Sequence, residues 1–171
     1  MPTYTQIGTA QVVGSGGAAS IDFSSIPSTY TDLVCVLSAR CTASDGAASW
    51  MSTLIKVNGS TAGSHIFVFG DGSTAASSSN GSLRWTYTDG HNATASTFGN
   101  LQVYIPNYAN TTTNKSYSVD AVTENNATGA NASLDAGLVS STSAITSFGF
   151  VPNSGSFVQY STAYLYGVSN A

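Results

Sequence analysis

Side chains that can do acid–base or nucleophilic chemistry are few in this chain. Its 171 residues include eight acids, two histidines and two cysteines. His65 opens an apolar segment, and His91 follows the Asp89-Gly90 pair. Nucleophilic catalysis needs a nucleophile with a base beside it, and no Gly-x-Ser-x-Gly sequence is present. We therefore predict no catalytic residue and no enzymatic activity.

Two aspartates are the only candidates for a glycosidase pair. Hydrolysis of a polysaccharide needs two carboxyl groups held across a cleft. Asp71 and Asp89 lie in regions where neighbouring loops could bring them together, but each precedes a glycine, as turn residues commonly do. We interpret both as turn residues and keep a small hydrolase as a third hypothesis.

Metal binding has weak support in the sequence. Asp89, His91 and Asn92 offer three potential ligands within four residues. No second His or Cys at ligand spacing completes a zinc site, so we predict no metal and no cofactor. A calcium ion held at the surface by Asp71 or Asp89 with backbone carbonyls is left open.

The two cysteines, Cys35 and Cys41, are predicted to be free thiols. Six residues of one extended strand separate their Cα atoms by roughly 20 Å, which no disulfide spans. Cys35 lies in an apolar run and is expected to be buried.

One short segment has the composition of a recognition site. Trp85, Tyr87 and Asp89 share one face of an expected strand that runs into a turn, and His91 follows. Aromatic faces beside an acid and amides are suited to sugars. These four residues form the candidate ligand-contact patch; the alternative is a Trp and a Tyr in the core at the end of a strand.

The elements that must position these residues are predicted to be β-strands. Val, Ile, Thr, Phe, Tyr and Trp far outnumber the long helix formers, and Glu124 is the single glutamate. Turn dipeptides recur at short intervals, as in a sandwich of short strands. They are Asp45-Gly46, Asn58-Gly59, Asp71-Gly72, Asn80-Gly81 and Asp89-Gly90. We expect an all-β, antiparallel two-sheet sandwich of about 8–10 strands, jelly-roll-like, with a closed barrel as the alternative.

Alternation of apolar and polar residues gives the expected strand positions. They are residues 4–13, 19–24, 32–40, 50–58, 65–69, 83–88, 98–105, 116–124, two strands within 133–151, and 157–168. Residues 73–82 are expected to be a loop. We expect residues 1–171 to form a single β-sandwich domain, with residues 1–17 as an extended N-terminal contact segment.

Two features suggest contacts with other subunits. Residues 33–37 and 66–69 are apolar at every position, which predicts strands covered on both sides, by a second sheet and a loop or by a neighbouring subunit. In the last strand, Tyr160, Tyr164 and Tyr166 share a face and form the candidate subunit-interface face. The alternative for this face is a long central strand whose tyrosine hydroxyls reach the rim.

Charge excludes several partners. Only four basic residues are present, the net charge is −4 and the pI is near 4.6, so no basic surface for nucleic acid is expected. No apolar run approaches the roughly 20 residues that span a bilayer. The first residues lack the basic start and apolar stretch of a secretory signal. The 28 serines and 21 threonines give instead a surface of hydroxyl groups.

Several phrases at strand boundaries resemble the virion proteins of tailed bacteriophages, including capsid decoration (cement) proteins and tail-fibre tip modules. The phrases are residues 26–33 (IPSTYTDL), 57–59 (VNG), 105–108 (IPNY) and 161–167 (STAYLYG). The resemblance covers most of the chain, is carried by no catalytic signature and transfers no functional residue. It implies a jelly-roll or related sandwich, assembled as a homotrimer on the virion after synthesis in the host cytoplasm.

From this resemblance and the composition we expect a non-enzymatic virion structural protein. The leading hypothesis is a decoration protein that stabilises the capsid shell through contacts with itself and with the major capsid protein. The alternative is a tail-fibre or receptor-binding module that binds a glycan through Trp85, Tyr87, Asp89 and His91.

Overall fold

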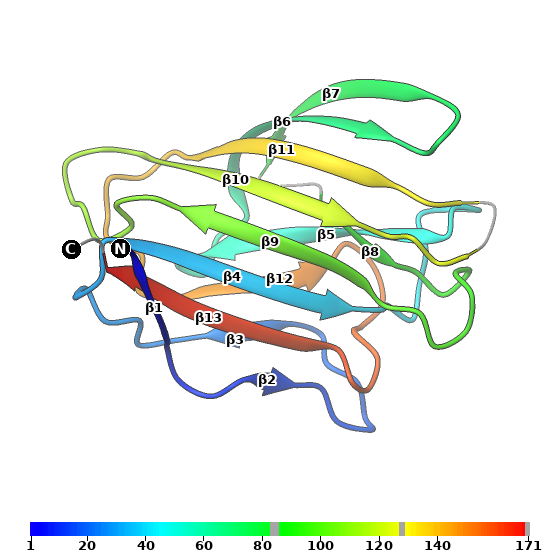
Figure 1. Ribbon diagram of the computed structural model, residues 1–171, viewed down its shortest axis with the longest axis horizontal. Helices are drawn as coiled ribbons and strands as arrows, with labels where there is room; N and C mark the ends of the chain where they lie inside the picture. Colours follow the sequence, from blue (N-terminus) through cyan, green and yellow to red (C-terminus); the bar gives the residue numbers. More distant parts are fainter. Residues whose placement is uncertain (83–85, 127–128, 170–171) are drawn as a thin grey trace.

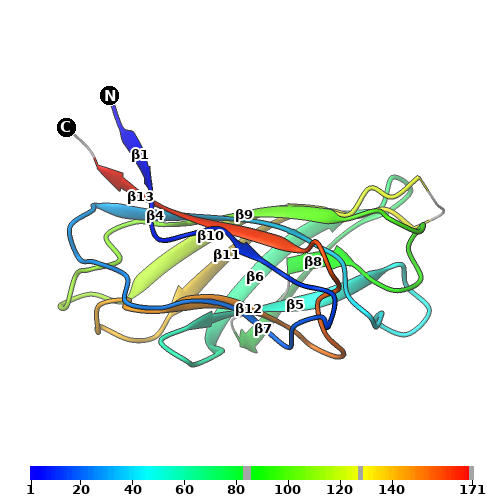
Figure 2. The same ribbon diagram turned by 90° about the horizontal axis from the view of Figure 1, so that it is seen from below.

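Two antiparallel β-sheets packed face to face make up the molecule (Figure 1, Figure 2). The computed structural model describes residues 1–82, 86–126 and 129–169. Every strand pairing among them is antiparallel. No helix in these ranges is long and apolar enough to cross a membrane. The predicted all-β, two-sheet sandwich is confirmed.

The large sheet has nine strands, in the order β1-β13-β4-β9-β10-β11-β6-β7, with β2 also paired to β13. Their bounds are β1 Thr3–Gln6, β2 Gln11–Val12, β4 Asp32–Ala39, β6 Ala62–Gly70, β7 Ala75–Ser82, β9 Gly99–Ile105, β10 Lys115–Val122, β11 Ala132–Val139 and β13 Thr162–Ser169. The hairpin of β6 and β7 ends the sheet on one side, and β1 and β2 end it on the other (Figure 1).

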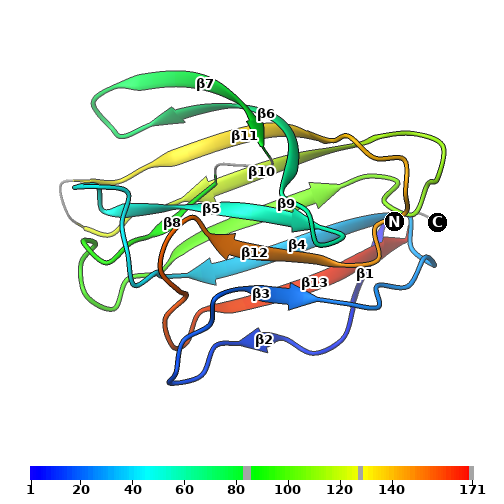
Figure 3. The ribbon, with the colours of Figure 1, turned by 180° about the vertical axis from the view of Figure 1, so that it is seen from behind.

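The small sheet has four strands, in the order β3-β12-β5-β8. Their bounds are β3 Ile21–Phe23, β5 Trp50–Val57, β8 Thr86–Asp89 and β12 Phe148–Pro152. Figure 3 shows this sheet in front of the large one. Its narrower width leaves the β6–β7 hairpin extending past its edge.

The core lies between the two sheets. Alternate residues of each strand point inward, so Leu37 of β4, Val103 of β9 and Leu165 of β13 are fully buried beneath the small sheet. Phe148 and Phe150 of β12 face them, with ring centroids 5.3 Å apart. Burying an aromatic or aliphatic side chain contributes roughly 1.5–3 kcal/mol, which makes this interior the main source of stability.

The expected loop at residues 73–82 is wrong, because most of it forms β7. Asp71-Gly72 does make a turn, with φ of 87° at Gly72, and β7 then pairs back onto β6. Ala, Ser and Asn have low strand propensity, so nothing local marks this segment as a strand. The backbone hydrogen bonds offered by β6 determine its conformation.

The expected strand at residues 157–168 begins later than predicted. Phe157 makes isolated bridges to Ala18 and Cys41, Tyr160 adopts a positive φ of 73°, and β13 starts at Thr162. Tyr160 is therefore exposed on a turn and does not share the strand of Tyr164. The turn redirects the chain, which alternation alone does not reveal.

The N-terminal segment also differs from one long strand at residues 4–13. Two short strands, β1 and β2, pair with successive parts of β13, and Gly8 between them has a φ of 67°. All four residues of β1 are exposed. In Figure 2, β1 and the end of β13 project together from one corner of the sandwich.

Candidate functional site

The outer face of the large sheet, which points away from the small sheet, is the broadest surface built from regular structure. Because the strands are in register, side chains of seven strands form one line across it. In order across the sheet the line contains Tyr164, Val36, Gln102, Asp120, Leu134, Val68 and Ser77. Its two ends differ in chemistry.

Tyrosines gather at the end of this face that contains β1, β13 and β9. The ring of Tyr166 packs edge-on against Tyr4, with centroids 6.5 Å apart, and Tyr164 is exposed on the same face of β13. The Tyr104 hydroxyl donates to Asp32 Oδ2 at 2.9 Å, and this hydrogen bond raises the pKa of Tyr104. We call Tyr4, Tyr104, Tyr164 and Tyr166 the tyrosine patch. Rings with a polar tip are suited to a surface that another molecule covers.

Aliphatic side chains lie at the other end, on β6 and β11. Ile66, Val68 and Leu134 are 62%, 55% and 62% exposed, although each is large and apolar. Val68 pairs with Leu134 across the strands. We call these three residues the aliphatic patch.

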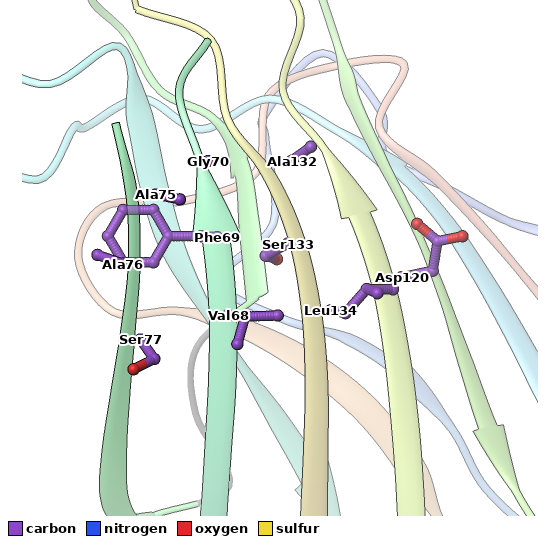
Figure 4. Close-up of a pocket in the computed structure, with 10 residues that line it drawn as sticks. All are labelled: Val68, Phe69, Gly70, Ala75, Ala76, Ser77, Asp120, Ala132, Ser133 and Leu134. Atoms are coloured by element: carbon purple, nitrogen blue, oxygen red, sulfur yellow. The ribbon is translucent and has the colours of Figure 1, made fainter. Parts of the chain in front are cut away.

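Small residues beside the aliphatic patch leave a hollow of about 610 Å³ (Figure 4). Gly70, Ala75 and Ala132 form one side of it, and Val68 and Leu134 stand on the other. Figure 4 shows these side chains on three neighbouring strands, with the carboxylate of Asp120 at the far rim. The hollow is open to solvent and apolar, without a converging set of polar groups.

The prediction that residues 66–69 are covered on both sides holds for one side of the strand only. Phe67 is buried as expected and packs against Tyr87. No described residue covers Ile66 and Val68, so the prediction that a loop of the same chain covers them is wrong. Their cover by a neighbouring subunit stays a prediction.

Few charges lie on this face. In the described strands of the large sheet, the charged residues are Asp32, Lys115, Asp120 and Asp135. Asp120 is exposed on the outer face, whereas the other three are buried. A surface of this kind makes contacts that salt screens little.

The predicted ligand-contact patch does not form a shared surface. Trp85 lies outside the described residues. Tyr87 is 7% exposed and Asp89 is 0% exposed, whereas His91 is exposed in the following loop. Phe67 and Phe69 of β6 pack edge-on against Tyr87, whose ring also packs against Trp50 at 5.8 Å. The described members therefore offer a sugar no aromatic platform.

Asp89 lies at the base of a loop that Arg40 organises. The Arg40 guanidinium donates to the carbonyl oxygens of His91, Ala93 and Thr94 at 3.1, 3.0 and 2.8 Å. Burial raises the pKa of Asp89, and the nearby Thr97 hydroxyl and Arg40 charge counteract part of this effect. The carboxylate has no route to a substrate.

Asp71 is a turn residue, as predicted. Its Oδ1 accepts hydrogen bonds from the backbone N–H groups of Ser73 at 2.9 Å and Thr74 at 2.7 Å. These bonds, with those of the two hydroxyl groups, hold the pKa of Asp71 well below its usual range. With Asp89 buried, the two acids do not form the open pair that a glycosidase needs.

A buried polar cluster lies under β6, β10 and β11, and sequence reasoning missed it. Asp135 is 5% exposed, and neither of its carboxylate oxygens has a hydrogen-bond partner among the described residues. The hydroxyl groups of Tyr117 and Ser133, on the same inward face, also lack partners there. Burial raises the pKa of Asp135 to about 8. Alternation in residues 132–139 predicts Leu134, Ala136 and Leu138 inward and Asp135 outward, whereas the structure exposes Leu134 and buries Asp135, so the pattern gave no signal for this cluster.

Tyr117 reaches this cluster because Gly137 leaves room for it. A Cβ at Gly137 would overlap the Tyr117 ring. His65, on the neighbouring strand, is buried and stacks on Phe67 at 5.3 Å. The cluster can hold a proton on Asp135, which is almost wholly buried although the residue borders a hollow between β6, β7 and β11.

Metal and thiol chemistry find little support in the described residues. No group of three His, Cys, Asp or Glu side chains that could hold a metal ion occurs there. Cys35 and Cys41 are free, as predicted, and Cys35 is buried, as expected; Cys41 is buried as well. Burial raises the pKa of both thiols, to about 11 for Cys41, so neither is a ready nucleophile.

Comparison of the chain with protein-family models, with curated proteins and with solved structures gives no match, so fold and site are interpreted from this chain alone.

Proposed function

We propose that this chain is a non-enzymatic virion structural protein, a capsid decoration protein that stabilises the shell of a tailed bacteriophage. In this proposal it forms a homotrimer and binds the major capsid protein through the outer face of the large sheet. The virion assignment rests on the resemblance of the strand-boundary phrases at residues 26–33, 57–59, 105–108 and 161–167.

One observation supports a function of contact: the aliphatic patch is exposed on a regular sheet face. Single exposed apolar residues are ordinary, but three large ones on adjacent strands form a connected patch. Covering them with a partner would release apolar surface from water at about 25 cal/mol per Å².

The tyrosine patch extends the same surface. Stable interfaces bury about 800 Å² on each partner and are enriched in tyrosine. The outer face has aliphatic residues at one end and tyrosines at the other, and Asp120 is the exposed charged residue in its described strands. This is the composition of such an interface.

The proposal is tested by adding purified protein to phage capsids that lack it and measuring co-sedimentation. We expect binding at a defined number of copies per capsid and, by electron microscopy, density spread over the shell. Binding confined to the tail tip would favour the receptor-binding alternative. Absence of binding to any particle would contradict both.

Variants locate the contact. Leu134→Ser removes an exposed side chain from the aliphatic patch and is expected to weaken capsid binding at least tenfold. Leu54→Ser is the matched control, because Leu54 lies half-buried on the outer face of the small sheet. Equal loss in both variants, or loss in neither, would rule out the outer face of the large sheet as the contact.

A further inference from the structure

The strand β7 is an edge without the usual protection against pairing with other chains. It closes one end of the large sheet and pairs on one side with β6. Residues 75–79 are exposed on both faces of the strand. Natural edge strands are blocked by charges, prolines, bulges or short length. β7 is eight residues long and contains no charged residue and no proline. The irregularity in its ladder with β6 lies between Ala62 and His65, opposite the end of β7, and leaves residues 75–80 regularly paired.

The other edges of the two sheets are protected. At the far end of the large sheet, β1 and β2 have four and two residues and are interrupted by Gly8. In the small sheet, β3 has three residues, and β8 has four that are all buried. The chain therefore has one long open edge in its described part.

We infer that β7 pairs with β7 of a second copy of this chain, antiparallel about a twofold axis. The unpaired backbone N–H and C=O groups of a long edge strand can pair with those of another long edge strand. In the described part of this chain, β7 is the strand of that kind. Its segment of Ala, Ser, Asn and Gly lets two copies approach without a charge or a bulky side chain between them. The net charge of −4 is too small to hold the copies apart.

Symmetry limits the registers that this pairing can adopt. In an antiparallel ladder, hydrogen-bonded and non-hydrogen-bonded pairs alternate, so a twofold axis places one residue opposite its own copy. A centre at Ser78 overlaps residues 75–81 of both copies, and a centre at Ser79 overlaps 76–82, which is equally long. We place Ser78 on the axis, because this register keeps the whole exposed segment 75–79 in the ladder and leaves out Ser82, where the β6–β7 pairing is irregular. Ser77 then lies opposite Ser79 of the other copy.

The pairing extends the aliphatic patch. Val68 is beside Ser77 and Ile66 is beside Ser79 in the β6–β7 ladder. Because Ser77 of one copy faces Ser79 of the other, the row of side chains that contains Val68 in one copy continues across the twofold axis into the row that contains Ile66 in the other. The result is one sheet with both aliphatic patches on the same face, separated by serines. The inference does not depend on the proposed virion role, and a twofold contact would be additional to the contacts of a trimer.

Disulfide trapping tests the register directly. In Ser78→Cys, the two introduced thiols face each other with Cα atoms about 5 Å apart, within disulfide range. Ala76→Cys is the matched control, because it is exposed on the same face of β7 but about 14 Å from its copy. We expect covalent dimers from Ser78→Cys and not from Ala76→Cys under mild oxidation. The buried Cys35 and Cys41 do not compete.

A charge variant tests the pairing without a covalent bond. Ser78→Lys places two ammonium groups opposite each other and is expected to weaken dimerisation at least tenfold in sedimentation equilibrium, with an unchanged thermal unfolding curve of the monomer. Ser140→Lys adds the same charge at an exposed loop position and is expected to leave the dimer intact. The inference is overturned if Ser78→Cys forms no more disulfide than Ala76→Cys, or if Ser78→Lys and the unmodified protein dimerise equally.

Discussion

Three ionisable side chains, Lys115 and Asp135 in the interior and Arg40 half-buried, differ in how their polar groups are satisfied. Lys115 donates from Nζ to the carbonyl oxygens of Thr142 at 2.6 Å and Ser143 at 2.7 Å, although burial lowers its pKa. Arg40 is satisfied in the same way by the loop after β8. Asp135 has no donor among the described residues, so its neutral form is the one that the interior accepts.

This difference gives Asp135 a defined effect on stability against pH. Its pKa is about 8 in the folded protein, above the value near 3.9 of an unfolded chain. Between these values the folded state keeps a proton that the unfolded state has released, so the free energy of unfolding falls as pH rises from about 4 to about 8. The stability is fully present below pH 4.

We predict that Asp135→Asn removes this dependence, because the amide resembles the protonated acid and does not ionise. In urea denaturation the variant is expected to be more stable than the unmodified protein by a few kcal/mol at pH 8, and close to equal at pH 4. Other titrating groups affect both proteins alike and cancel in the difference. A difference between the two proteins that does not change with pH would contradict the prediction.

At the scale of elements, the turn at Asn58 and Gly59, which connects β5 of the small sheet to β6 of the large sheet, also stabilises a second connection. Asn58 and Gly59 both have positive φ, 47° and 80°, as a two-residue hairpin turn requires. The Asn58 side chain also donates to Ala144 O at 2.9 Å and accepts from Thr146 N at 2.9 Å. It thereby holds the connection that leads into β12.

Two substitutions separate these roles. Asn58→Gly keeps the backbone conformation and loses the side-chain hydrogen bonds, which is expected to destabilise the protein by about 1–2 kcal/mol. Asn58→Ala loses the same bonds and adds the strain of an alanine at positive φ, about 1 kcal/mol more. Equilibrium unfolding in urea measures both. Equal stability of the two variants would show that the turn tolerates an ordinary residue.

The same elements show what sequence alone could and could not predict. Asn58-Gly59 and Asp71-Gly72 were predictable, because the backbone preferences of these residues are local. β7 was not, because residues 75–82 become a strand only by pairing with β6. The burial of Tyr87 depends on the position of β6, whose Phe67 and Phe69 pack against its ring. Tyr164 and Tyr166 were placed correctly by alternation, and Tyr160 was not, since the turn before β13 interrupts the pattern.

At the scale of the whole molecule, the small sheet buries one face of the large sheet and leaves the other open. The open face joins the tyrosine patch to the aliphatic patch through nearly uncharged strands. A partner bound to this face would therefore be held by apolar burial and hydrogen bonds, not by ion pairs.

We predict that binding through this face depends little on ionic strength. Between about 0.05 and 0.5 M NaCl, where screening of exposed charges changes strongly, the dissociation constant is expected to change less than about threefold. Co-sedimentation or self-association measured across that range provides the check. A steep, linear loss of affinity with the logarithm of salt concentration would indicate a charged contact elsewhere on the molecule.

The way the cationic side chains are tied down has a consequence for digestive enzymes. Trypsin cleaves after Lys and Arg, and this chain has only four such residues. Of the three that the structure describes, Lys115 and Arg40 are held by carbonyl oxygens, and Lys56 lies within β5, paired to Asp22 at 2.6 Å. Cleavage at these three positions therefore requires local unfolding of the surrounding structure. The rate of proteolysis there measures how often the sandwich unfolds locally.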